Sequence, residues 1–276
     1  MFKFLLSKLA DKKEDVSFWE HVDALRSFLI KSILAIFLFS VITFFLKDFI
    51  FNVIILYPKS SDFITYRVFC KLGNMLNTDS LCMGDIDFSL INLSLGGQFR
   101  WHIIISLISG LIVAIPFILW QLWHFVRPAL KSEEIRYSKR AIFYIIFLFS
   151  FGLFFGYYLI LPLTIQFLGN YVLSDQITNQ ISINSYISNV CIIPLSIGII
   201  FELPALVYFL SKTEIVSSEF LRKKRKYSII VVLIVAAIIT PSTDAFTMMV
   251  VALPLYALYE ISIFIACRVE KKKNKI

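Results

Sequence analysis

Residues 103–123 read IIISLISGLIVAIPFILWQLW and carry no charged side chain. A helix that crosses a membrane needs about 20 mostly apolar residues, because the hydrocarbon is about 30 Å thick and each residue adds about 1.5 Å. Five further segments meet this requirement or come close to it: 27–46, 141–161, 190–210, 227–240 and 245–266. The segment at 227–240 is short, which implies a thinned bilayer or shielding by protein. The sequence therefore predicts an all-α integral membrane protein with six transmembrane helices.

The composition supports a membrane protein. Of the 276 residues, 58% are hydrophobic and 17% are charged, and 28 are Phe. Soluble domains average about 45–50% apolar and about 25% charged residues, so a typical soluble globule and a disordered chain are both excluded. The net charge of +8 would suggest a nucleic-acid partner in a soluble protein. In a membrane protein it first indicates orientation, and we expect no nucleic-acid partner.

The cations divide unequally between the two sides of the predicted spans. Most of the 27 Lys and Arg lie before the first span, after the last, or between spans two and three and spans four and five. The positive-inside rule then places both termini in the cytoplasm. We expect a cytoplasmic segment at 1–26 with an interfacial amphipathic helix, a six-span domain at 27–266 with a long outer loop at 47–102, and a basic tail at 267–276.

Two stretches on the predicted inner side combine acids with the start of a helix. Residues 17–20 form a capping box that opens an amphipathic helix, and a simple interfacial anchor would explain this pattern equally well. Glu133 and Glu134 follow Ser132 just before the third span. They either complement the helix dipole or form a carboxylate surface for the guanidinium groups of an Arg-bearing peptide.

Polar residues inside the predicted spans are candidates for function. Glu202 and Glu260 lie within spans four and six, where an ionisable side chain costs about 2.5–3.5 kcal/mol. Each is either a polar tie between helices or a site that faces the bundle or a partner. Pro162 and Pro204 are expected to bend or end helices. Two further polar residues need a partner or a cap: Gln121 in span two and Asp244 in the turn before span six.

The remaining motifs favour neither catalysis nor a metal site. Cys70 and Cys82 lie in the outer loop and either form a disulfide in an oxidising compartment or remain two free thiols. No Cys or His spacing is typical of a metal site, and no nucleophile, zinc-protease or phosphate-loop motif is present. We therefore expect neither an enzyme nor a bound cofactor.

Several short motifs occur in an order that matches one family. They are residues 21–26, 119–123 with 125–130 and Glu134, then Gly152, Phe155, Tyr157 and Pro162, then 201–204, 222–227, and 240–241 with Asp244. From residue 17 to 266 the chain resembles the TatC family, the multispanning receptor subunit of the twin-arginine, Sec-independent protein translocase.

This resemblance implies a concave, glove-like bundle in the bacterial cytoplasmic (inner) membrane. It implies that the chain binds Arg-Arg signal peptides of folded proteins and assembles with the single-span subunits TatA and TatB and with other copies of itself. It also implies that the proton-motive force drives the export of these proteins. The implied peptide-binding residues are Glu134 as the main contact, with Glu133, Glu20, Asp23, Arg26, Phe125, Pro128 and Leu130. The implied polar or partner contacts are Glu202, Gln121, Glu260, Asp244 and the outer-loop Pro58.

One departure from the family pattern concerns the first motif. Ala24 stands where the family has an acid, and Glu20 and Asp23, three residues apart on one helix side, are candidates to supply the charge. The main alternative function is a secondary transporter of a small solute. Such a transporter would use an intramembrane acid and broken helices, and only Glu202 with Pro204 matches this pattern. Many transporters also contain internal repeats, and this sequence shows none.

Overall fold

The computed structural model describes residues 18–75, 88–126, 132–171, 174, 179–213, 215–240 and 245–273. Within them, the side chains at 18–21, 126, 132–141, 246 and 272–273 are not described. Five helical stretches are long and apolar enough to cross a membrane: Val22–Phe45, Gly97–Phe125, Ile142–Asn170, Ile183–Lys212 and Thr247–Lys271. They confirm the all-α membrane fold and five of the six predicted spans.

The sixth predicted span is the helix α11 (Arg225–Ile239), which has 15 residues. At about 1.5 Å per residue it is about 22 Å long, which is less than the thickness of the hydrocarbon. The other five spans are longer, and two of them combine two helices. These are α2 (Phe18–Phe45), α5 (Gly97–Val126), α6 (Ser132–Phe155) with α7 (Leu161–Asn170), α8 (Ile183–Ile200) with α9 (Leu203–Lys212), and α12 (Ala245–Lys273).

The two prolines predicted to interrupt helices act differently. Pro162 does not end its span, because a π-helical segment, η5 (Gly156–Ile160), joins α6 to α7 and the rod continues to Asn170. A π turn accommodates a proline that cannot donate a backbone hydrogen bond. Pro204 does mark a break: α8 ends at Ile200, and Pro204 lies in the first turn of α9. Phe201 and Glu202 form the turn between them.

Close helix contacts depend on glycine. A Cβ atom built on Gly110 of α5 would lie 2.5 Å from the backbone nitrogen of Ser40 on α2. One built on Gly156 would lie 2.8 Å from the Cα atom of Pro194 on α8. Small residues at such crossings let helix backbones approach closely, which is the usual means of association inside a membrane.

The long loop predicted at 47–102 folds onto one end of the bundle. Its described elements are α3 (Lys47–Phe49), the π-helix η1 (Ile50–Ile55), the 3-10 helix η2 (Tyr57–Lys59), α4 (Ile64–Met75) and β1 (Ser89–Ile91). We call these elements, with β2 (Gln180–Ser182), the cap. The parallel pairing of β1 with β2, with Ser89 opposite Gln180, was not predicted. Such pairing joins segments far apart in the chain and leaves little local signal.

Tyrosine hydroxyls attach the cap to the spans. The Tyr157 hydroxyl donates to the Ile54 carbonyl at 2.7 Å, and the Tyr186 hydroxyl donates to the Ile55 carbonyl at 2.9 Å. These carbonyls lie at the end of η1, where a helix lacks backbone donors of its own. The cap is therefore held in a defined position on the bundle.

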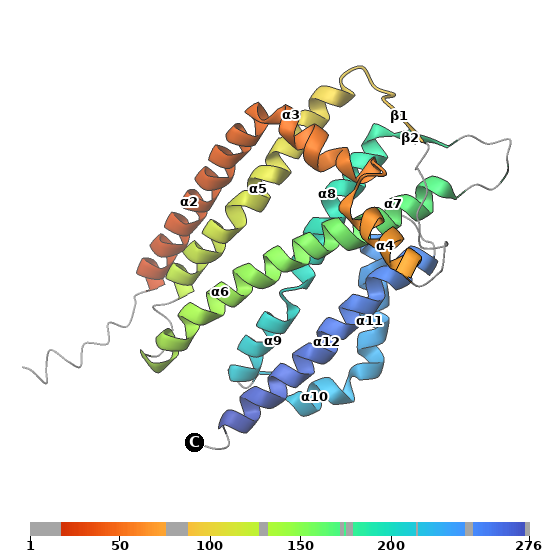
Figure 1. Cartoon of the computed structure of the whole chain (residues 1–276). Coiled ribbons are helices and arrows are strands. Elements are labelled where there is room, and N and C mark those ends of the chain that lie inside the picture. The colour runs from red at the N-terminus through yellow and green to blue at the C-terminus, as the bar shows by residue number, and fades with distance from the viewer. Residues whose placement is uncertain are drawn as a thin grey trace, which may run out of the picture.

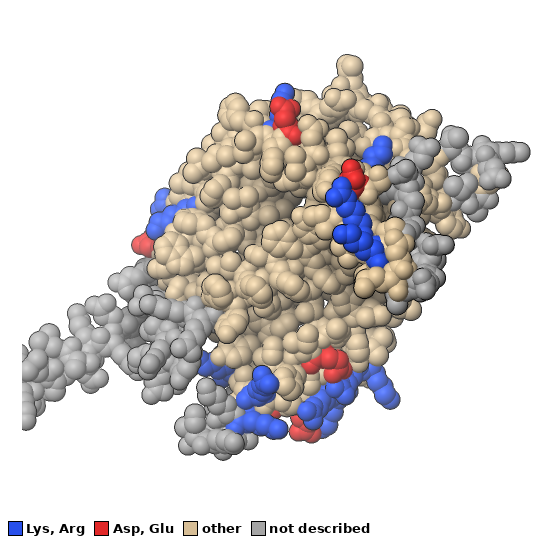
Figure 2. Space-filling view, in the orientation of Figure 1, with Lys and Arg blue, Asp and Glu red and all other residues tan. Residues whose placement is uncertain are grey.

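The helix ends are arranged as the alternation of loops predicts. One set of helix ends lies opposite the cap (Figure 1). It comprises the start of α2, the end of α5, the start of α6, the end of α9, the short helix α10 (Ser218–Lys223) and the end of α12. We call this the basic end, defined by Arg222, Lys223, Lys224, Arg225, Lys226, Arg268 and Lys271. Figure 2 shows blue side chains along this edge and a largely uncharged surface between it and the cap.

Candidate functional site

A cavity of about 800 Å³ lies between two groups of helices. One wall comes from α5, α6, α8 and α9, and the other from α10, α11 and α12. The lining residues are Ile115, Leu119, Phe149, Ile199, Ile200, Glu202, Leu203 and Leu206 on the first wall and Phe220, Leu221, Lys224, Tyr227, Ser228, Val231, Val232, Val235, Leu255 and Tyr259 on the second. The bundle is therefore concave, with an apolar interior surface.

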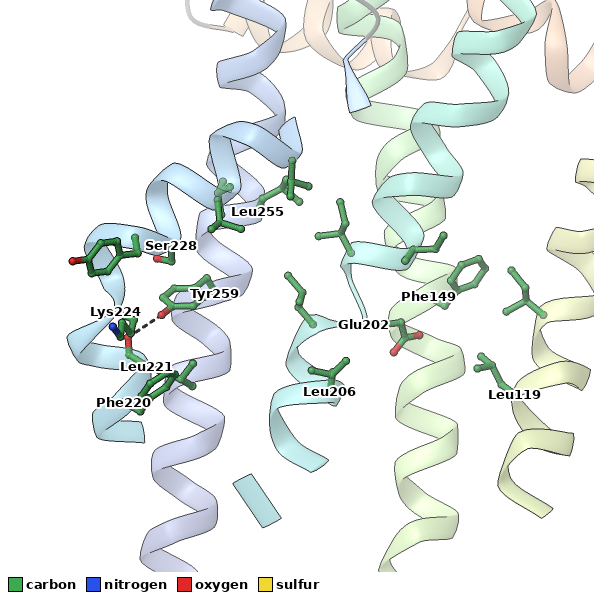
Figure 3. A pocket seen from close by; sticks show the side chains of 18 residues that line it. Leu119, Phe149, Glu202, Leu206, Phe220, Leu221, Lys224, Ser228, Leu255 and Tyr259 are labelled. Atoms are coloured by element: carbon green, nitrogen blue, oxygen red, sulfur yellow. Dashed lines mark hydrogen bonds between the residues drawn. The ribbon is translucent and has the colours of Figure 1, made fainter. Parts of the chain in front are cut away.

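Glu202 is the acidic residue among the described residues that line this cavity. It lies at the break between α8 and α9, where it precedes the first turn of α9 and its carbonyl accepts from the Leu206 N–H at 2.9 Å. Its Oε1 atom is buried and has no hydrogen-bond partner among the described residues. The helix break thus places a carboxylate in a largely apolar lining, and Figure 3 shows it beside Phe149.

The polar side chains on the opposite wall are engaged within their own wall. The Tyr259 hydroxyl donates to the Leu221 carbonyl at 2.8 Å, and the Ser228 hydroxyl donates to the Arg225 carbonyl at 2.7 Å. The Lys224 ammonium group lies 5.0 Å from the centre of the Tyr227 ring. Figure 3 places Lys224, Ser228 and Tyr259 across the cavity from Glu202. The arrangement suits an apolar occupant that offers a hydrogen-bond donor to Glu202.

Glu260, the second predicted intramembrane acid, has a different environment. Its Oε2 atom lies 2.6 Å from a guanidinium nitrogen of Arg225, and its Oε1 atom accepts from the Tyr256 hydroxyl at 3.1 Å. Arg225 begins α11 and Glu260 lies on α12. Glu260 therefore ties α11 to α12, which is the structural alternative left open for this residue.

Those of the predicted peptide-binding residues that the structure describes fall on helix ends at the basic end. Asp23 and Arg26 are exposed on α2, and Phe125 near the end of α5 stacks on Phe28 of α2 with ring centres 6.1 Å apart. The structure therefore brings the first motif and the end of the second span together. The structure does not describe Pro128 and Leu130, nor the side chains of Glu20, Glu133 and Glu134. The backbone of Glu133 and Glu134 lies in the first turn of α6.

The other candidate residues are dispersed. Pro58 is buried in the cap, where its carbonyl accepts from the Tyr66 hydroxyl at 3.0 Å. Gln121 is half-buried on α5 near Leu119, whereas Asp244 lies outside the described residues. Cys70 lies on α4 and is disulfide-bonded, so it is not a free thiol, whereas Cys82 is not described and its pairing with Cys70 stays a prediction. No group of three metal-ligating side chains occurs among the described residues.

Comparison with known proteins identifies the family. The model for the "Sec-independent protein translocase protein (TatC)" family matches residues 20–254. The chain belongs to the TatC family. It is 38% identical over 267 residues to the TatC protein of Blattabacterium sp. subsp. Periplaneta americana, a match that covers 96% of this chain and 100% of the relative. The TatC protein of Carboxydothermus hydrogenoformans is 34% identical over 258 residues, covering 94% of this chain and 96% of the relative.

Two solved TatC structures have the same fold. A crystal structure of the twin arginine translocase receptor TatC has a TM-score of 0.70 and 32% identity, and the match covers 91% of this chain and 100% of that one. A crystal structure of the receptor in DDM has a TM-score of 0.71 and 35% identity, covering 89% and 98% of the two chains. The chain is thus a multi-pass membrane protein of a Sec-independent translocase family, which confirms the resemblance found in the sequence.

Two residues of the site could not be singled out from the sequence. Lys224 lies in a run of cations at 222–226, where it has no feature that distinguishes it from its neighbours. Arg225, in the same run, pairs with a residue on another helix. Only the packing of α10 and α11 against α12 shows that one cation enters the cavity wall and the next neutralises Glu260.

Proposed function

We propose that this chain is the receptor subunit of a twin-arginine translocase. It resides in the bacterial inner membrane with both termini in the cytoplasm, and it binds the Arg-Arg signal peptides of folded proteins. It assembles with TatA- and TatB-type single-span subunits and with further copies of itself, and the proton-motive force drives export. The observation that carries this proposal is the match to solved twin arginine translocase receptors over nearly the whole chain.

The basic end is the proposed site for the arginine pair. Asp23 is exposed on α2, and Glu133 and Glu134 fall in the first turn of α6 at the same end of the bundle (Figure 1). Planar guanidinium groups pair with carboxylates through two parallel hydrogen bonds, which lysine cannot reproduce. Glu134 is the proposed main contact, and Glu20 and Asp23 replace the family acid that is missing at Ala24.

The cavity is the proposed second contact. Its apolar walls fit the apolar part of a signal peptide or the single helix of a partner subunit. A donor on that helix would satisfy the Glu202 Oε1 atom, which has no partner among the described residues. Because an unpaired polar group is costly in a low-dielectric setting, this contact would favour a correctly placed helix.

Crosslinking of a signal peptide tests the proposal. A peptide with a photoreactive group beside its Arg-Arg pair should crosslink to the parent protein in inner-membrane vesicles, and a Lys-Lys peptide should not. Glu134→Lys should abolish the crosslink and the export of Arg-Arg cargo while leaving membrane insertion intact. Glu219→Lys is the matched control, because Glu219 is an exposed acid at the same end that pairs with Lys223 at 2.8 Å. Export by the Glu134→Lys variant at the parent level would reject the proposal, as would equal crosslinking of both peptides.

A further inference from the structure

The helix α4 is held on the bundle by one face only. On that face the Thr65 hydroxyl donates to the Tyr158 carbonyl, and the Tyr66 hydroxyl donates to the carbonyls of Pro58 and Pro162 at 3.0 and 3.3 Å. Burial raises the pKa of Tyr66 above its usual range, so this hydroxyl stays a donor. Gly73, near the other end of the helix, is also buried. The rotation of α4 about its own axis is therefore fixed.

The opposite face of α4 exposes an apolar stripe. Ile64, Val68, Leu72 and Met75 recur at helical spacing and are 51%, 49%, 45% and 82% exposed. If this stripe faced water, four large apolar side chains would remain solvated, and the favourable free energy of burying them would not be gained. Within a protein that spans a membrane, a stripe of this kind indicates contact with lipid or with another protein.

Basic side chains flank the stripe. Arg67 and Lys71 follow Ile64 and Val68 by three residues each and are exposed, and α4 contains no acidic residue. Arg67 also pairs with Asp62, which precedes the helix, at 2.8 Å. A short helix with an apolar face and Lys or Arg beside it is typical of helices that lie in the plane of a membrane surface.

The start of α4 contacts a candidate membrane span that exposes aromatic side chains. The Phe63 ring, just before α4, stacks on the Tyr158 ring with centres 5.6 Å apart, and Tyr158 stacks on Phe154 at 6.2 Å. Phe151 and Phe154 are more than half exposed on α6, within the span Ile142–Asn170. Figure 1 shows α4 beside α7 at the cap end of this span. The buried Phe63 ring and the Tyr158 ring thus join the start of α4 to a spanning helix whose aromatic side chains are exposed.

We propose that α4 is an interfacial helix that docks the cap onto the phospholipid surface. The stripe at Ile64, Val68, Leu72 and Met75 enters the boundary between headgroups and acyl chains, and Arg67 and Lys71 lie at the level of the phosphates. Because tyrosine hydroxyls join the cap to the spans, a bilayer contact through α4 would fix the depth of the whole cap. This role requires neither cargo nor partner subunits.

Photocrosslinking in vesicles tests the proposal. The photoreactive residue p-benzoylphenylalanine replaces Val68, or Leu72 one turn later, in the full chain reconstituted into phosphatidylethanolamine–phosphatidylglycerol vesicles. Irradiation should raise the mass of both variants by one phospholipid. Phe154 serves as the lipid-facing positive control, and Gln180, exposed on β2 of the cap, serves as the control away from the stripe.

Each other outcome would overturn the proposal. A product with twice the mass of the chain at Val68 or Leu72 would show that a second copy covers the stripe. Adducts no more abundant than at Gln180, with Phe154 labelled normally, would show that the stripe faces water. Since the measurement contains no signal peptide, failure here would leave the proposed receptor function untouched.

Discussion

Glu202 and Glu260 are chemically identical side chains that the fold places in different environments. Glu260 is engaged by Arg225 and Tyr256, whereas the Glu202 Oε1 atom has no partner among the described residues. The sequence predicts that both lie within spans. It does not predict which acid is paired, because Arg225 and Glu260 lie on different helices and their contact depends on how α11 packs on α12.

Neutralising the two acids should therefore affect stability differently. Glu260→Gln leaves the Arg225 guanidinium without its carboxylate, and the melting temperature should fall by about 2–4 °C, a modest loss because the pair is partly exposed. Glu202→Gln should leave the melting temperature unchanged or raise it, because an amide costs less to bury than a carboxylate. Thermal unfolding in mild detergent, followed by tryptophan fluorescence, measures both.

The double variant Arg225→Gln/Glu260→Gln is the control for this comparison. Removal of both charges should recover part of the loss, as expected for two side chains that interact directly. Equal melting temperatures for Glu202→Gln and Glu260→Gln would contradict the assignment of Glu260 as the structural tie.

At the scale of elements, the predictions succeed where the signal is local. Long apolar runs predict the five long spans, and Pro204 predicts the break between α8 and α9. The π-helical segment that precedes Pro162 is not predicted, because a shift in backbone hydrogen bonding leaves no trace in an apolar run. The pairing of β1 with β2 is missed for a related reason, since each strand has only three residues and gains its partner from a distant loop.

The glycine in η5 offers a test of how these elements pack. Gly156→Ala would place a Cβ atom 2.8 Å from the Pro194 Cα atom, so α8 and the α6–α7 rod would have to separate. We expect a loss of about 1–3 kcal/mol in the free energy of unfolding, the usual cost of overpacking. Unfolding in mixed micelles of mild detergent and dodecyl sulfate measures this loss.

Gly96 provides a matched control for this substitution. A Cβ atom added there has no neighbour within 4 Å, so Gly96→Ala should leave the unfolding free energy close to that of the parent. If Gly156→Ala were equally stable, the close approach of η5 to α8 would not be a determinant of the packing.

At the scale of the whole molecule, the site consists of two regions that the sequence predicts unequally. The charge pattern predicts which loops gather at the basic end, and the helix ends lie together there (Figure 1). The cavity is only partly predicted. Glu202 stands out as an acid in an apolar span, but the second wall is formed by mostly apolar residues of α10, α11 and α12 and by Lys224. Its position depends on packing that no local pattern encodes.

The two regions should be separable by filling the cavity. Val231 and Ile230 are neighbours on α11 with nearly equal exposure, 57% and 56%, but only Val231 is among the described residues that line the cavity. Val231→Trp should hinder entry of a helix, and export of Arg-Arg cargo should fall by roughly tenfold, the effect of losing about 1.4 kcal/mol of binding. Ile230→Trp places the same indole side chain outside the cavity and should export normally. Because the basic end is unchanged, both variants should still crosslink an Arg-Arg peptide beside its arginine pair, whereas equal export by the two variants would argue against a role for the cavity in transport.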